Sequence, residues 1–261
     1  MINYSFSIYD LEYFLLILVR VTSFVYLAPF FSLNGVPRQV RIALSLFLSA
    51  MLYGMLTPAD AVVTDSLLEY AIIVAKETIC GLLMGFSTMI CTSALNFAGT
   101  IADMEIGLSM VQILDPASRQ NVSITGAFYN YGFTMILIAS GMYRYLIGAL
   151  ADSFRLIPVN GVVFHWDHLM QSMIVFLGDY VLIGFEIILP IFCSVMMLNA
   201  ILGIIARVSP QMNMFSIGIQ LKIIVGLGVL MLTIGLMPKA SDLVFDEVKK
   251  VMVLFVEGMM E

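Results

Sequence analysis

The chain of 261 residues is 61% hydrophobic and only 11% charged, and its mean hydropathy is +1.02. Soluble domains are close to half apolar and about one quarter charged, so this composition indicates a membrane protein. The net charge of −6 excludes a basic surface for binding nucleic acid.

Apolar runs separated by polar segments follow one another along the chain. They cover residues 11–33, 42–56, 67–102, 124–151, 169–208 and 217–237, and a last stretch, 239–261, is amphipathic. The pattern predicts an all-α polytopic membrane protein with about six apolar segments, since a spanning helix needs about 20 apolar residues. Gly81 and Gly85 form a GxxxG pattern, which lets helix backbones approach closely.

Two features of this pattern conflict with a simple bundle in lipid. The run at 169–208 would be roughly 60 Å long as one helix, against a hydrocarbon core of about 30 Å. If the basic turn with Arg38 and Arg41 is cytoplasmic, simple alternation leaves Lys239, Lys249 and Lys250 on the outer side, against the positive-inside rule. Both conflicts predict that the chain packs inside an assembly and does not face lipid along its whole length.

A polar stripe runs along the predicted helix at 67–102 and consists of Thr88, Thr92, Asn96, Gly99 and Asp103. At 100° per residue these positions fall within about 80° of arc. One interpretation is hydrogen bonding between helices, which Thr and Asn provide in membranes. The other is the wall of a wet cavity, because Asp103 is costly elsewhere at membrane depth.

Several charged side chains are predicted to be buried: Lys76, Glu77, Asp103, Asp179 and Glu186. Lys76 and Glu77 point about 100° apart, so each needs a partner elsewhere. Asp179 and Glu186 share a helical face roughly 10 Å apart, which is too far to share one proton. A proton relay or an ion pair with Lys222, Lys76 or a partner subunit would explain them, and the ion pair is preferred.

No residue pattern typical of an enzyme or a cofactor site is present. Cys80 and Cys91 would lie roughly 16 Å apart on one helix, too far for a disulfide. His165 and His168 lack a third metal ligand nearby, and no phosphate-binding or nucleophile motif occurs. We therefore expect neither catalysis nor a bound cofactor or metal.

Four stretches of the sequence, taken together, resemble one family. They are RVTSFVYLAPFFSLNGVPRQVRIALSLFLSA (20–50), ETICGLLMGF (77–86), DPASRQNVS (115–123) and ARVSPQMNMFSIGIQLKI (206–223). In this order they resemble the flagellar biosynthetic protein FliR family of the type III secretion export gate. The resemblance covers about residues 13–237. It departs from the family at Ile219 and Gln220, where members commonly carry an aromatic residue followed by proline.

The resemblance implies a non-enzymatic subunit of the flagellar export gate, in the bacterial inner membrane at the flagellar basal body. Unfolded flagellar proteins are exported through this gate, which is built with the sister proteins FliP and FliQ and to which FlhB attaches. It implies that residues 1–168 resemble a FliP subunit and that 169–238 form a FliQ-like hairpin. Residues 239–261 follow as the amphipathic C-terminal helix.

The resemblance also implies that a polar loop plugs the channel, here within residues 103–123. Its residues would include Met110, Gln112, Ile113, Leu114, Asp115, Pro116, Arg119 and Asn121. A plug is physically reasonable because Pro116 stops a helix from continuing, and irregular backbone at membrane depth must face protein or a cavity. An ordinary solvated loop is the alternative.

The last of the four stretches is expected to form the tip of the C-terminal hairpin at about 207–216. Pro210 interrupts the helix there, and polar side chains satisfy the freed backbone groups or bond to partner subunits. The residues expected at the tip or in contact with partners are Arg207, Ser209, Pro210, Gln211, Asn213, Phe215 and Lys222.

Two other functions stay open on sequence alone. One is the injectisome relative of the same family, although the segments at 115–123 and 209–218 favour the flagellar branch. The other is a proton-coupled transporter of small solutes that uses Asp179 and Glu186.

Overall fold

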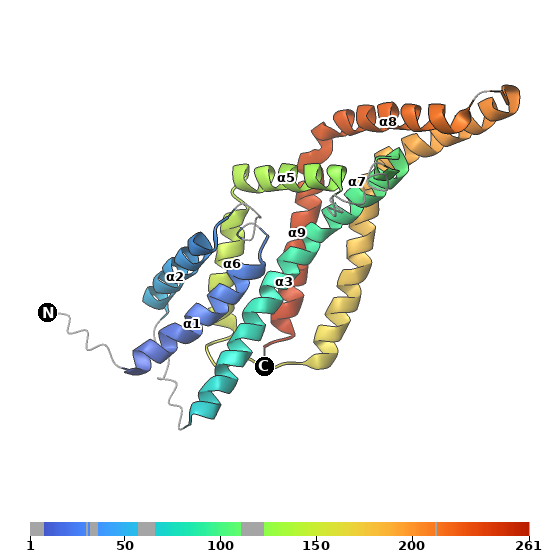
Figure 1. The fold of residues 1–261 in the computed structure, drawn as a ribbon. Helices are drawn as coiled ribbons and strands as arrows, with labels where there is room; N and C mark the ends of the chain where they lie inside the picture. The colour runs from blue at the N-terminus through green and yellow to red at the C-terminus, as the bar shows by residue number, and fades with distance from the viewer. Residues whose placement is uncertain are drawn as a thin grey trace. The chain divides into compact units, whose positions relative to one another are not determined.

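The computed structural model describes residues 8–29, 31, 36–56, 66–110, 123–211 and 213–260, and all regular structure in this part of the chain is helical. In chain order the helices are α1 (Ile8–Leu27), α2 (Arg38–Met55), α3 (Leu67–Ile106), α5 (Ile124–Ala139), α6 (Tyr143–Leu156), α7 (Trp166–Val208), α8 (Met214–Thr233), the 3-10 helix η2 (Ile234–Leu236) and α9 (Met237–Glu257) (Figure 1). The predicted all-α fold class is confirmed.

Long apolar helices confirm that the protein is polytopic. Among the described residues, three stretches are long and apolar enough to cross a membrane: Leu67–Ile106, Trp166–Val208 and Ser216–Glu257. A fourth results if α5 and α6, which meet at a bend of 74°, form one broken span. The first two apolar runs of the sequence form α1 and α2, which are not among these candidates.

The chain divides into two compact units. The first comprises Met1–Ile90, Gly141–Phe176 and Glu247–Glu261, and the second comprises Cys91–Ser140 and Leu177–Asp246. Helices α3, α7 and α9 each contribute residues to both units, so neither unit is continuous in sequence. The domain boundaries after residues 168 and 238, which were predicted from the resemblance of the two parts to FliP and FliQ, stay predictions.

In the first unit, α1 and α3 approach closely through the GxxxG pattern. A Cβ atom added to Gly81 would overlap the carbonyl oxygen of Arg20, and one added to Gly85 would lie 2.8 Å from Cβ of Leu27. Only glycine fits at these two positions, and the close approach of the helices that the sequence predicted is confirmed.

A buried ion pair joins these two helices. Arg20 Nε lies 2.5 Å from Glu77 Oε2, and neither side chain is exposed. Arg20 Nη1 also donates to the carbonyl oxygen of Ile157 at 2.9 Å, while Glu77 Oε1 accepts from the backbone N–H of Asn160 at 3.0 Å. The pair therefore ties the end of α6 and the turn that follows it to α1 and α3.

The turn after α6 has the backbone that this contact requires. Asn160 has a φ of 71°, a left-handed conformation that asparagine tolerates better than most residues. The backbone N–H groups of Val163 and His165 then donate to the carbonyl oxygens of Met259 and Gly258, at 3.2 and 3.0 Å. The C-terminal end of the chain is thus fixed to the same loop.

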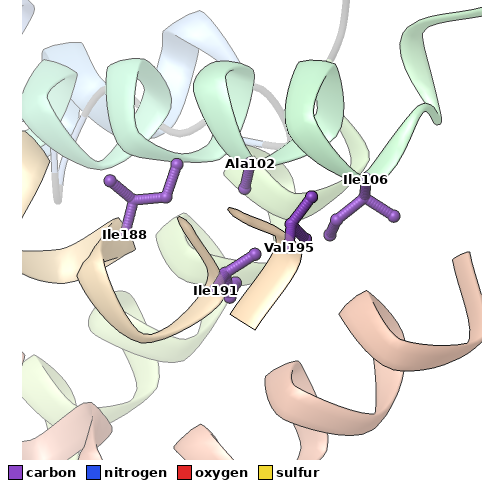
Figure 2. Packing of buried hydrophobic residues seen from close by; sticks show 5 residues of the cluster. All are labelled: Ala102, Ile106, Ile188, Ile191 and Val195. Carbon is purple, nitrogen blue, oxygen red and sulfur yellow. The ribbon is translucent and has the colours of Figure 1, made fainter. Parts of the chain in front are cut away.

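In the second unit, an apolar cluster joins the end of α3 to the middle of α7. Ala102 and Ile106 of α3 pack with Ile188, Ile191 and Val195 of α7, and all of them are fully buried (Figure 2). Helix α8 also comes close, since a Cβ on Gly226 would lie 2.5 Å from Ile106 Cγ1. The end of α3, where the polar segment begins, is therefore held against the hairpin of α7 and α8.

Candidate functional site

The segment predicted to be a plug begins where α3 ends. Gly107 follows Ile106 with a φ of 94°, the left-handed conformation in which glycine commonly terminates a helix. Met110 lies just beyond and is exposed. The other predicted plug residues lie outside the described residues: Gln112, Ile113, Leu114, Asp115, Pro116, Arg119 and Asn121.

Helix α5 begins after this segment, and Asp103 of α3 holds its first residues. Its Oδ2 accepts from the backbone N–H of Ile124 at 2.7 Å. Its Oδ1 accepts from the Thr125 hydroxyl at 2.5 Å and from the Thr125 N–H at 3.2 Å. A carboxylate at a helix N-terminus satisfies otherwise unpaired N–H groups and is favoured by the helix dipole. One side chain thus ties together the two helices that flank residues 111–122.

The polar stripe of α3 continues this contact along α5. Asn130 Nδ2 donates to Asn96 Oδ1 at 2.6 Å, and Gly99 lies directly against Gly126, where an added Cβ would overlap the backbone N and Cα of Gly126. Of the two interpretations of the stripe, the structure favours hydrogen bonding between helices for Asn96 and Asp103. Gly99 contributes close backbone packing.

Changing Gly99 to alanine tests this contact. The added methyl group is expected to push α3 and α5 apart and to lower the free energy of unfolding by about 1–3 kcal/mol, the usual cost of overpacking. Gly228→Ala in α8 is the matched control, because nothing lies within 4 Å of its Cβ position, and it should be neutral or slightly stabilising. Denaturant unfolding in detergent micelles measures both, and equal midpoints would contradict the close contact.

A hollow of about 310 Å³ lies between the end of α3 and the hairpin. Its lining from α3 and the following turn is Met104, Glu105, Gly107, Ser109 and Met110, and from α7 and α8 it is Asn199, Leu202, Gly218, Ile219 and Lys222. The predicted plug residue Met110 and the predicted hairpin residue Lys222 therefore line the same hollow.

The hairpin tip is shorter than the predicted 207–216. Helix α7 ends at Val208, α8 begins at Met214, and Asn213 caps α8 by accepting from the N–H of Ser216 at 3.4 Å. Arg207, Pro210 and Gln211 are exposed, Ser209 is half-buried, and Phe215 lies in the first turn of α8. Lys222 lies two turns further along α8, away from the tip.

The charged residues predicted to be buried have different environments. Glu77 is fully buried and Asp103 is 2% exposed, and both are held by the contacts described above. Lys76 and Asp179 are half-buried, whereas Glu186 is exposed on α7. Among the described residues, no group of three or more His, Cys, Asp or Glu is arranged to hold a metal ion.

A comparison with known families decides where the chain belongs. The model of the family described as "Bacterial export proteins, family 1" matches residues 11–248. The chain belongs to this family. The resemblance inferred from the four sequence stretches is confirmed.

Curated relatives of the chain include proteins with flagellar names and a surface presentation of antigens protein. The flagellar biosynthetic protein FliR of Aquifex aeolicus is 28% identical over 240 residues, which cover 92% of each chain. FliR of Bacillus subtilis is 25% identical over 256 residues, or 97% of this chain and 95% of the relative. The surface presentation of antigens protein SpaR of Shigella flexneri is 22% identical over 205 residues, which cover 78% of this chain and 77% of the relative.

Sequence reasoning missed the partners of the charged residues. Arg20 was visible as a charge inside an apolar run, and Glu77 as an acid needing a partner, but their pairing joins positions 57 apart. Two opposite charges, each alone in an apolar run, were the signal that could have suggested it.

Proposed function

We propose that the chain is a non-enzymatic subunit of the flagellar type III export gate, where it helps to form and to close the channel for unfolded flagellar proteins. The observation that carries this proposal is the hold of Asp103 on Ile124 and Thr125. It fixes both helices from which residues 111–122 extend, as a plug anchored at its two ends requires. Residues such as Leu114, Asp115 and Arg119 would then close the channel.

The proposed gate contains FliP, FliQ and FlhB as partners and lies in the bacterial inner membrane. Only 28% of the most apolar window of Trp166–Val208 and 11% of that of Ser216–Glu257 is buried inside the chain, which leaves surface free for lipid and for partner subunits. These stretches have 43 and 42 residues, about twice what a bilayer covers. The parts beyond the lipid are best covered by other subunits, including contacts at the hairpin tip.

Deleting residues 114–119 tests the plug. The variant is expected to assemble but to make the inner membrane leaky to small ions, because the channel loses its closure while Asp103 still holds α5. Ion conductance of membranes from cells that produce the variant is the measurement. A deletion of equal length at residues 59–64 is the control and should leave conductance unchanged. Equal conductance in both variants would contradict the plug assignment.

The SpaR relative favours a second candidate, the export apparatus of an injectisome. Complementation separates the two. A flagellar subunit should restore swimming to a bacterium that lacks its own flagellar copy, whereas an injectisome subunit should restore effector secretion instead.

A further inference from the structure

Helix α7 has two apolar faces within the second unit. Ile188, Ile191 and Val195 point into the core against α3 (Figure 2). The opposite face is exposed and carries residues at alternating spacings of four and three: Leu182, Glu186, Leu189, Cys193, Met196, Ala200 and Gly203. We call these residues the α7 seam.

The spacing of the α7 seam is that of a helix-packing interface. An alternation of four and three averages 3.5 residues, the period at which one helix presents a continuous row of side chains to another. The row falls within about 100° of arc. Its later part carries the small residues Cys193, Ala200 and Gly203, which allow close approach between membrane helices, and nothing lies within 4 Å of the Cβ position of Gly203.

Glu186 indicates what kind of helix would pack against the α7 seam. It is exposed near the middle of a candidate membrane span, and in the described part of the chain it makes no hydrogen bond or ion pair. An unpaired acid facing lipid is costly. Its seam neighbours Leu182 and Leu189 are 58% and 55% exposed, and at membrane depth lipid covers leucines as well as a helix does. The acid is different, because lipid offers it no counter-charge, so a partner helix with a positive charge is what satisfies Glu186.

We propose that the α7 seam binds a membrane helix of a partner subunit that presents a lysine or arginine to Glu186. This inference rests on the proposed function, in which the chain is one subunit of a larger gate. A second copy of this chain fits poorly. Two copies inserted in the same orientation would face each other with parallel α7 helices, which would bring Glu186 against Glu186.

A charge reversal tests the recognition. The full chain is purified with its partners from native membranes in mild detergent, and the copurified membrane subunits are quantified. Glu186→Lys is expected to reduce one of them at least tenfold, and Glu186→Gln to reduce it less. Asp242→Lys is the matched control, because Asp242 is exposed on α9 and lies off the seam. Full recovery of every subunit with Glu186→Lys would overturn the proposal.

A steric pair of variants makes the test independent of charge. Gly203→Leu is expected to block the seam and to lose the same subunit, whereas Gly228→Leu on α8 should retain it. Nothing lies within 4 Å of either Cβ position, so both variants should fold. Retention of the subunit by both variants would contradict docking at the seam.

Cross-linking from Cys193 identifies the occupant. This thiol is exposed on the seam, and a maleimide-linked photo-cross-linker can be attached to it once Cys80 and Cys91 are replaced by alanine. The proposal expects a cross-linked membrane helix that contains lysine or arginine. Cross-links to lipid only, to a second copy of this chain, or to a helix without a basic residue would each refute it. The leak caused by deleting 114–119 would persist in those cases, so the two failures are distinguishable.

Discussion

Glu77→Gln is expected to lower the free energy of unfolding by about 3–5 kcal/mol, because it leaves the charge of Arg20 buried without a counter-charge. The site has no access to water, since both side chains are fully buried. Arg20→Met should cost a similar amount by leaving Glu77 unpaired among α1, α3 and the turn after α6. Denaturant unfolding in detergent micelles measures both variants.

The double variant shows whether the charges or the packing hold the unit together. Arg20→Met combined with Glu77→Leu removes both charges, and apolar residues of similar volume often replace a buried pair without loss. We therefore expect the double variant to be more stable than either single variant. Arg155→Met is the control, since its pair with Asp152 spans 3.7 Å with side chains 73% and 65% exposed, and exposed pairs contribute little. Single variants as stable as the native chain would contradict this account.

Much of the fold could be predicted because it depends on local patterns. Apolar runs gave the positions of the long helices, and the observed α3 (Leu67–Ile106) extends only four residues beyond the predicted end at Ala102. The GxxxG pattern at Gly81 marked a close helix contact because only glycine permits backbones to approach so nearly. Family membership followed from four short stretches in a fixed order.

What the sequence did not reveal depends on contacts between distant residues. The polar stripe showed that one face of α3 differs from the others, but a helical period contains no information about which helix it meets. The partner of Asp103 lies 21 and 22 residues away at Ile124 and Thr125. For Glu186 the sequence predicted burial, because the residue lies in an apolar run, but the chain alone leaves its side chain exposed.

Asp103→Ala is the second substitution expected to lower the free energy of unfolding strongly. The change leaves the Thr125 hydroxyl and backbone N–H, both in a residue that is 1% exposed, without an acceptor. Buried donors without acceptors cost about 1–3 kcal/mol each, so the expected loss of unfolding free energy for the two donors is about 2–6 kcal/mol. Asp103→Asn keeps one acceptor oxygen and should lose about half as much. Denaturant unfolding in micelles measures the loss.

The same variant connects stability with closure of the channel. If residues 111–122 plug the channel, releasing the start of α5 frees one of their two anchors, and membranes carrying Asp103→Ala should leak ions. Glu105→Ala is the matched control, because Glu105 lies two residues further along α3, is half-buried and lines the hollow instead of capping α5. It should leave both stability and conductance near the native values. An Asp103→Ala variant that unfolds early and stays ion-tight would mean that the contact with α5 supports the fold alone. In that case the plug would need an anchor other than Asp103.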